Sequence, residues 1–455
     1  MPTVLNTILL VLSLSIGLTA SAMAEQLQDW EAAYRRNDFT TAYRLLGPLA
    51  DGGDVNAQYS RGVMLRDGRG VPQDAAEAAV WFRKAAGQDD AKAQYNLGAM
   101  YLSGQGVPQD YAAAERLFRS AARQGMSQAQ HNLGVMFRDG LGVPQNSVEA
   151  ATWFRKAAQQ GLAPAQYNLG VMLLSGQNVE RNPAEAMAWF RKAAEQGVAQ
   201  AQYNLGVSLR DGYGGPQNQA EAVVWLRKAA EQGNVKAQSE LGSALLAGQG
   251  VPQSYPETAT WFHKAAVQGD TKAQYNLGVM LVAGQGLPQN YADAGVWFRK
   301  AAEQGDAKAQ LNLGVLLRDG QGVPRSASES VLWFRKAAEQ GEASAQHNLG
   351  AMLLAGTGVR QDLAEAATWF RKAAEQGTAQ SQYNLGLMLA DGLGVARNSV
   401  DAYKYFTLAA HQSDVSTTGF ANQATQAREM LAKRMTPSQI AEAQNLASEW
   451  KPSSK

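Results

Sequence analysis

The sequence predicts an all-α fold, an α/α solenoid superhelix of ten 36-residue helix-turn-helix repeats with capping helices at both ends. One unit recurs ten times without insertion or deletion, each half of it has the spacing of an amphipathic helix, and glycine or proline separates the halves. A unit of this size cannot bury its apolar face alone, so neighbouring copies must stack. The copies begin at Ala57, Ala93, Ala129, Ala165, Ala201, Ala237, Ala273, Ala309, Ala345 and Ser381.

Residues 1–24 are expected to be a signal peptide. An apolar stretch from about Val4 to Leu18 precedes small residues at 22–24, which favours cleavage before Glu25. Because no lysine or arginine lies near the start, an uncleaved membrane anchor is the alternative. No later stretch has the roughly 20 apolar residues of a membrane span, so no stable span is expected after cleavage.

The segments that flank the repeats are predicted to be caps. In residues 25–56, Leu45 and Leu46 stand where later copies place tryptophan and phenylalanine, which predicts N-terminal capping helices. The ten repeats fill residues 57–416, and residues 417–455 are expected to form C-terminal capping helices. Terminal units with a polar outer face keep a solenoid soluble.

The first half of each copy predicts a helix that ends at a glycine. In the seventh copy, Ala273, Leu277, Met280 and Leu281 lie on one helical face, and Gly284 follows at the place of a left-handed cap. The same place is occupied by Gly68, Gly104, Gly140, Gly176, Gly212, Gly248, Gly320, Gly356 and Gly392. A second glycine and a proline then predict a turn. A further glycine inside the first helix, such as Gly98 or Gly170, predicts close packing.

The second half predicts another helix, opened by a reciprocal capping box and closed before a glycine such as Gly197. The pairs that fit the box are Asp74/Glu77, Asn146/Glu149, Asn182/Glu185, Asn218/Glu221, Ser254/Glu257, Asn290/Asp293, Ser326/Glu329, Asp362/Glu365 and Asn398/Asp401. Tryptophan occupies one place in eight of these helices, where we expect it to fill the gap between repeats rather than to stack on a sugar.

The segments AQYNLG, GxGVPQ(D/N) and WFRKAAEQG resemble the Sel-one-like repeat (SLR) family, an α/α solenoid family related to tetratricopeptide repeats. The resemblance covers about four-fifths of the chain. It implies an adaptor or scaffold whose first helices line the concave side. Some cysteine-rich relatives have been proposed to act like β-lactamases, but this chain lacks their cysteine pairs.

The net charge and the absence of cysteine limit the kinds of partner and site that the protein can have. The 41 basic and 40 acidic side chains give a net charge of +1, which argues against nucleic acid as a partner. With no cysteine, there can be no disulfide, thiolate metal site or cysteine nucleophile. An exported protein from a Gram-negative source would be periplasmic, with secretion or surface association as the next addresses.

Recurrent Arg-Lys pairs could form a basic ridge for a polyanion. The alternative is a solvated structural ridge in which acids further along the same helix pair with the cations. Those acids are Glu195, Glu231, Glu303, Glu339 and Glu375.

The face of the first helix opposite its apolar side is the candidate binding surface, here named the Tyr/Arg stripe. Its members stand at the third and tenth positions of the copies, and tyrosine and arginine are enriched in binding hot spots. They are Tyr59, Arg66, Tyr95, His131, Arg138, Tyr167, Tyr203, Arg210, Tyr275, Arg318, His347 and Tyr383. Packing of the tyrosines within the solenoid is the alternative. An asparagine in eight of the ten copies at the fourth position is expected to bind backbone of adjoining turns.

No cofactor, metal site or catalytic residue is predicted, because the four histidines lie in distant copies of a solenoid whose contacts are local. The leading hypothesis is a non-enzymatic scaffold of the cell envelope that binds a protein, as a peptide or helix, on the concave face. An envelope glycan or polyanion binding protein is the alternative, and a β-lactamase-like hydrolase is a minor one. The sequence leaves the partner and the oligomeric state open.

Overall fold

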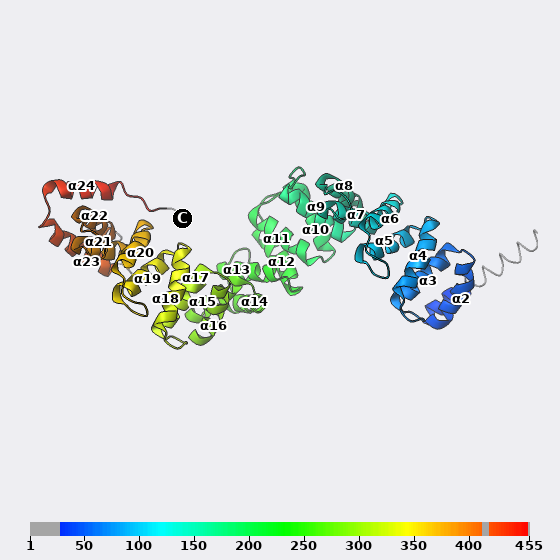
Figure 1. The fold of residues 1–455 in the computed structure, drawn as a ribbon, viewed down its shortest axis with the longest axis horizontal. Coiled ribbons are helices and arrows are strands. Elements are labelled where there is room, and N and C mark those ends of the chain that lie inside the picture. Colours follow the sequence, from blue (N-terminus) through cyan, green and yellow to red (C-terminus); the bar gives the residue numbers. More distant parts are fainter. Residues whose placement is uncertain (1–27, 412–417, 454–455) are drawn as a thin grey trace, which may run out of the picture. The chain divides into compact units, whose positions relative to one another are not determined.

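The computed structural model describes residues 28–411 and 418–453, and every regular element in them is a helix (Figure 1). The predicted signal peptide lies outside these residues. No described helix combines the length and the apolar character that crossing a membrane requires. The chain divides into two compact units with a boundary between Ala229 and Ala230, within α12.

Each repeat consists of two helices, as predicted. The first helices are α3 (Val55–Asp67), α5 (Ala91–Ser103), α7 (Ser127–Asp139), α9 (Ala163–Ser175), α11 (Ala199–Asp211), α13 (Val235–Ala247), α15 (Thr271–Ala283), α17 (Ala307–Asp319), α19 (Ala343–Ala355) and α21 (Ala379–Asp391). The second helices are α4 (Ala75–Gly87), α6 (Tyr111–Arg123), α8 (Ser147–Gln159), α10 (Pro183–Glu195), α12 (Gln219–Glu231), α14 (Tyr255–Val267), α16 (Tyr291–Glu303), α18 (Ala327–Glu339), α20 (Leu363–Glu375) and α22 (Ser399–Ala410).

Consecutive helices pack against each other from α2 (Phe39–Asp51) to α11 in the first unit and from α13 to α22 in the second. At the C-terminus, α23 (Thr418–Ala432) packs on α22 and α21, and α24 (Pro437–Ser448) packs on α22. Contacts between neighbours in sequence define a solenoid, so the predicted α/α fold is confirmed.

The left-handed glycine caps of the first helices are confirmed in all ten repeats. Their φ angles run from 66° at Gly284 to 77° at Gly212, and the cap N–H bonds to a carbonyl four residues back, as from Gly284 to Met280. The apolar face is confirmed too, because Ala273, Leu277 and Met280 are buried.

The glycine inside each first helix is a close-packing site, as expected. A Cβ on Gly134 would lie 2.6 Å from the ring of Phe154, and one on Gly170 would lie 2.7 Å from the ring of Phe190. Because the glycine has no side chain, the phenylalanine of the second helix can approach the backbone of the first. This contact sets the distance between the two helices of a repeat.

The predicted capping box is correct in one half and wrong in the other. The side chain of Asp74, for example, accepts from the backbone N–H of Glu77 at 2.8 Å. The return bond is replaced: the N–H of Asp74 donates to the carbonyl of Leu65 at 3.0 Å, and Glu77 accepts from the indole N–H of Trp81 at 3.3 Å. Ser254 makes no side-chain cap bond. A complete reciprocal box occurs at Thr436 and Gln439, at the start of α24.

Candidate functional site

All twelve residues of the Tyr/Arg stripe lie on first helices and are partly exposed. The first unit carries eight of them, from Tyr59 on α3 to Arg210 on α11. The second unit carries Tyr275 on α15, Arg318 on α17, His347 on α19 and Tyr383 on α21. The same helical positions therefore present a side chain repeatedly along each unit.

The aromatic members of the stripe pack with one side on the second helix of their own repeat. The rings of Tyr59 and Phe82 have centroids 5.9 Å apart, and those of His131 and Phe154 are 5.5 Å apart. Equivalent contacts join Tyr95 to Phe118, Tyr167 to Phe190, Tyr275 to Phe298, His347 to Phe370 and Tyr383 to Phe406. Both interpretations of these rings thus hold in part, since each ring packs internally and also keeps an exposed portion.

The arginines of the stripe are held in fixed positions. Arg138 binds both carboxylate oxygens of Asp139, at 2.7 and 2.8 Å, and Arg318 binds Asp319 in the same way. These hydrogen bonds hold the pKa of each aspartate below its ordinary value. Fork geometry of this kind restricts the guanidinium orientation, so the arginines would lose little conformational freedom on binding.

Asparagines at the fourth position connect these arginines to the next repeat. Arg66 donates to the side-chain oxygen of Asn96 at 2.5 Å, and Asn96 donates to the carbonyl of Lys92 at 2.8 Å. The expected backbone bond is thus present at Asn96, but the bond from the preceding repeat was not anticipated. Arg318 reaches Asn348 at 3.0 Å in the same way.

Tryptophan, glutamate and arginine form a second recurrent network, here named the Trp–Glu–Arg ladder. Glu185 accepts from the indole N–H of Trp189 at 3.1 Å and from Arg155 of the preceding repeat at 2.7 Å. Burial raises the pKa of Glu185, but the bonds from Trp189 and Arg155 outweigh it and lower the pKa. The same inter-repeat ion pairs join Arg191 to Glu221, Arg299 to Glu329 and Arg335 to Glu365.

This ladder corrects the expected charge pairing. The prediction that acids at the end of the same helix pair with the cations is wrong for Arg191, Arg299 and Arg335, whose partners lie 30 residues further along the chain. Arg155 has no such acid in its own helix and also binds a glutamate 30 residues further on. The lysine of each Arg-Lys pair lies over a tryptophan, as Lys156 does over Trp153 at 4.2 Å. The arginines bind glutamates of the next repeat in place of acids in their own helix. Residue spacing within one helix does not reveal such a partner.

The tryptophans are core residues, as predicted. Trp81 is 5% exposed, and Trp153, Trp225, Trp261, Trp333 and Trp369 are also buried. Trp189 and Trp297 are partly buried and pack against the core. Burial, together with the lysine that lies over each partly buried ring, leaves little indole face for stacking on a sugar.

Two columns of glutamine link the repeats, and sequence reasoning missed them. Gln166 is buried, donates to the carbonyl of Ala158 at 3.2 Å, and accepts from Gln196 at 2.8 Å. The signal was in the sequence, because the second and thirty-second positions of all ten copies are glutamine. A polar residue that never varies within one chain indicates a buried hydrogen bond.

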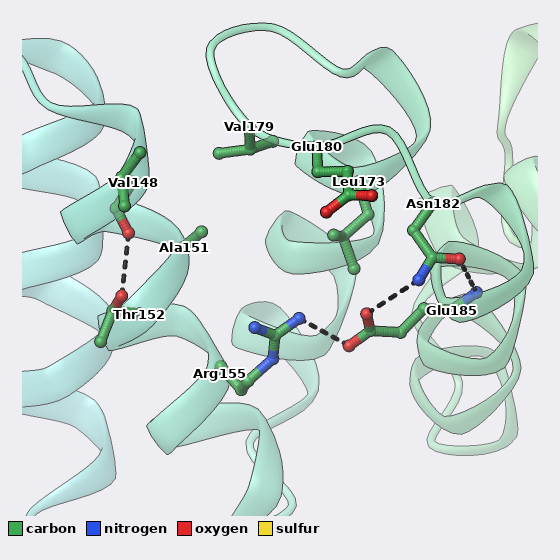
Figure 2. Close-up of a pocket in the computed structure, with 9 residues that line it drawn as sticks. All are labelled: Val148, Ala151, Thr152, Arg155, Leu173, Val179, Glu180, Asn182 and Glu185. Carbon is green, nitrogen blue, oxygen red and sulfur yellow. Dashed lines mark hydrogen bonds and ion pairs between the residues drawn. The ribbon is translucent and has the colours of Figure 1, made fainter.

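A hollow of about 410 Å³ lies between α8, α9 and α10, and Figure 2 shows the residues that line it. It is lined by Val148, Ala151, Thr152, Arg155, Leu173, Val179, Glu180, Asn182 and Glu185. The Arg155–Glu185 pair of the Trp–Glu–Arg ladder crosses its floor. Arg155, Glu185 and Asn182 bind one another, Thr152 donates to the carbonyl of Val148, and the lining includes no nucleophile with an adjacent base.

Metal binding and acid–base catalysis find no support in the described ranges 28–411 and 418–453. No group of three or more metal-ligating side chains occurs there. The four histidines lie on or next to different helices, at His131, His263, His347 and His411. His131 and His347 take part in ring packing, which is a structural use of the residue.

Acid is expected to destabilise the fold through His131 and His347. Burial lowers the pKa of both, and nearby Arg138 and Arg318 lower it further. Asn168 donates to Nε2 of His131 at 3.0 Å, which requires a neutral ring. Because the folded pKa lies below the unfolded one, stability is full above the unfolded value of about 6.5 and is lost as pH falls through the folded pKa.

The test replaces both histidines by tyrosine, the residue at this position in six other repeats. Thermal unfolding followed by circular dichroism from about pH 8 to about pH 5 should show a smaller loss of midpoint in the His131→Tyr, His347→Tyr variant. Equal loss in variant and parent would contradict the assignment.

Comparison with known proteins agrees with this geometry. Ten consecutive segments match the family model described as Sel1 repeat, over residues 55–90, 91–126, 127–162, 163–198, 199–234, 235–270, 271–306, 307–342, 343–378 and 379–414. These segments begin two residues before the copies defined above, at the true start of each first helix.

Two solved structures are similar over most of their length. One is c5321, a protective antigen of uropathogenic Escherichia coli strains with an SLR fold, at a TM-score of 0.85 and 37% identity over 94% of this chain and 91% of that chain. The other is a Sel1 repeat protein from Oxalobacter formigenes, at a TM-score of 0.53 and 34% identity over 68% of this chain and 89% of that chain. No curated protein matches the chain.

Proposed function

The chain belongs to the Sel1 repeat family, whose fold commonly serves as a non-enzymatic scaffold for protein interactions, and from this premise we propose that its Tyr/Arg stripe binds a protein partner. The ligand is an extended peptide or a helix that lies along the first helices on the concave side. The observation that carries the proposal is the recurrence of partly exposed rings beside arginines that are already fixed.

The fixed geometry favours binding for an energetic reason. Association costs about 0.5–1.5 kcal/mol for each flexible side chain that it immobilises. In the stripe this cost is reduced, because Phe154 supports the ring of His131 and Asp139 orients Arg138. Aromatic and arginine side chains that meet a partner in such a state are typical binding hot spots.

We further propose that the protein acts in the cell envelope, with the periplasm as its address after removal of residues 1–24. The apolar N-terminal stretch supports export. The E. coli relative is described as a protective antigen, and we take this as support for an exported location here.

The observations favour a protein partner over an envelope glycan or polyanion. The glycan hypothesis needs open indole faces, but most of the repeat tryptophans are buried. The two that are partly buried, Trp189 and Trp297, have a lysine over the ring. The polyanion hypothesis needs free cations, but Arg155 and Arg191 bind glutamates of the next repeat.

Replacing Arg138 and Tyr167 together by leucine is expected to abolish partner capture while leaving the fold intact. Other repeats already carry leucine at these two positions. Leu102 and Leu174 correspond to Arg138, and Leu311 corresponds to Tyr167, so the solenoid accommodates the changes. The mature chain would be used to capture partners from envelope extract, with mass spectrometry to identify them and thermal unfolding to check stability.

Val296→Ala is the matched control, because Val296 is 51% exposed on a second helix, away from the stripe. Capture should fall about tenfold or more in the double variant, the loss expected on removal of a hot spot, and should be unchanged in the control. Unchanged capture by a stable double variant would overturn the proposal.

A further inference from the structure

The C-terminal segment after α24 returns to the ninth repeat and binds the turn between α20 and α21. The backbone N–H of Ser453 donates to the carbonyl of Glu375 at 2.8 Å, and its hydroxyl donates to the same oxygen at 3.1 Å. The indole of Trp450 and the ring of Pro452 lie 3.7 and 3.9 Å from where a Cβ on Gly377 would be. A four-residue segment, Trp-Lys-Pro-Ser, thus covers one helix-ending turn.

The chemistry of this contact is specific. Glu375 ends α20, and the last carbonyls of a helix have no partner within the helix and carry partial negative charge. The segment supplies donors at Ser453 and a positive charge at Lys451. Gly377 has φ of +92°, so the turn exposes bare backbone on which the indole can lie.

The same turn recurs, open, in the other repeats. Gly305 and Gly341 have φ of +96° and +90° within the same Glu-Gln-Gly sequence, and no described atom lies within 4 Å of their Cβ positions. The turns at Gly125, Gly161, Gly197, Gly233 and Gly269 are equally uncovered in the part of the chain that the structure describes. One turn is therefore occupied in a row of otherwise similar turns.

The helix that delivers the segment, α24, packs on α22 with one face. Within α24, Ala443 is the one fully buried residue, and Ile440 and Ala447 are partly buried. Most of the helix faces solvent, including Leu446. The contacts of Trp450, Pro452 and Ser453 with the turn are therefore a second attachment of this segment, beside the packing of α24 on α22.

We propose that the open second-helix turns are docking sites for a partner segment of the form Trp-x-Pro-Ser with a basic charge, and that the C-terminal segment of the chain fills the site at Gly377. This edge is separate from the Tyr/Arg stripe, which lies on the first helices. The partner's indole covers the bare glycine, and its backbone N–H and hydroxyl bind the terminal carbonyl of the second helix. The segment of the chain itself shows which chemistry the turn accepts.

Disulfide trapping provides a direct test, because the chain contains no cysteine. The probe is a synthetic peptide of residues 449–455 with Ser453 replaced by cysteine, and the receptor is the full chain carrying Glu339→Cys at the open Gly341 turn. Under mild oxidation the peptide should react about tenfold or more faster with this chain than with a Gln321→Cys chain. Gln321 is exposed in the loop at the opposite end of α18.

Two variants test the recognition itself. Trp450→Ala in the peptide removes the indole, and Gly341→Asp in the receptor places a side chain where the indole would lie. The aspartate is tolerated at this position, since Asp89 occupies it in the first repeat with φ of 71°. Either change should reduce the trapping rate to that of the Gln321→Cys control.

Trapping at Glu339→Cys no faster than the control, or undiminished by Trp450→Ala, would overturn the proposal. A full chain with both Glu339→Cys and Ser453→Cys tests whether the turns bind the C-terminal segment of a second copy of this chain. If it forms disulfide-linked dimers as fast as the peptide reacts, the turns bind a second copy of this chain, and the assignment to a separate partner is wrong.

Discussion

Replacing Gly322 with alanine is expected to lower the free energy of unfolding by more than about 3 kcal/mol, because it combines backbone strain with a steric overlap where the loop contacts the preceding repeat. Gly322 has φ of +69°, and a Cβ there would lie 2.3 Å from the backbone of Tyr291 and Ala292. Those two residues begin α16, the second helix of the preceding repeat. Backbone cannot move aside as a flexible side chain would.

Gly305→Ala separates the two causes. Gly305 also has positive φ, +96°, but nothing lies within 4 Å of its Cβ position. It should therefore show strain alone, about 1–2 kcal/mol. Urea unfolding of both variants, followed by circular dichroism, gives the comparison, and equal losses would refute the close approach at Gly322.

The close approach of Gly322 to the preceding repeat could not be predicted from the sequence. The glycine-proline loop predicted a turn, which is present, but the contact of Gly322 with the previous repeat follows from how the repeats stack. The cap glycines such as Gly284 were predictable, because their role depends on the local backbone alone. Local conformation can be read from one copy, whereas a contact between copies requires their relative placement.

The same distinction explains the errors in charge and capping. The predicted capping box paired Glu185 with Asn182 at the start of its own helix, and the predicted ridge paired Arg191 with Glu195 in its own helix. In the structure Glu185 accepts from Trp189 and from Arg155 of the preceding repeat. Arg191 likewise binds Glu221 of the next repeat, a partner that spacing within one helix does not reveal.

The candidate site was predictable as a set of positions. Helical projection placed all members of the Tyr/Arg stripe on one face of the first helices; in the structure all of them lie on first helices and are partly exposed. It did not reveal that Arg66 reaches Asn96 in the next repeat, or that Tyr59 rests on Phe82. These contacts hold the exposed residues of the stripe against the core and the next repeat. The packing beneath the stripe therefore affects the binding that we propose.

Replacing Phe154 with alanine is expected to cost about 3–5 kcal/mol of unfolding free energy, the usual loss when a buried aromatic ring is deleted. Phe154 is 0% exposed, fills the space over Gly134, and supports the ring of His131. The cavity would therefore open between the two helices of the repeat and directly beneath the stripe. Hydrogen exchange of the first helix α7 should rise together with the fall in the urea midpoint.

Phe154→Leu should cost much less, because Leu226 occupies this place in the fifth repeat and packs over Gly206. Val148→Ala, at a side chain 63% exposed on the same helix, should change stability by no more than about 0.5 kcal/mol. A loss for Phe154→Ala as small as that for Phe154→Leu would mean that the ring does not hold the helices apart. Partner capture should follow the same order as stability, since His131 and Arg138 depend on the position of α7 for their place in the stripe.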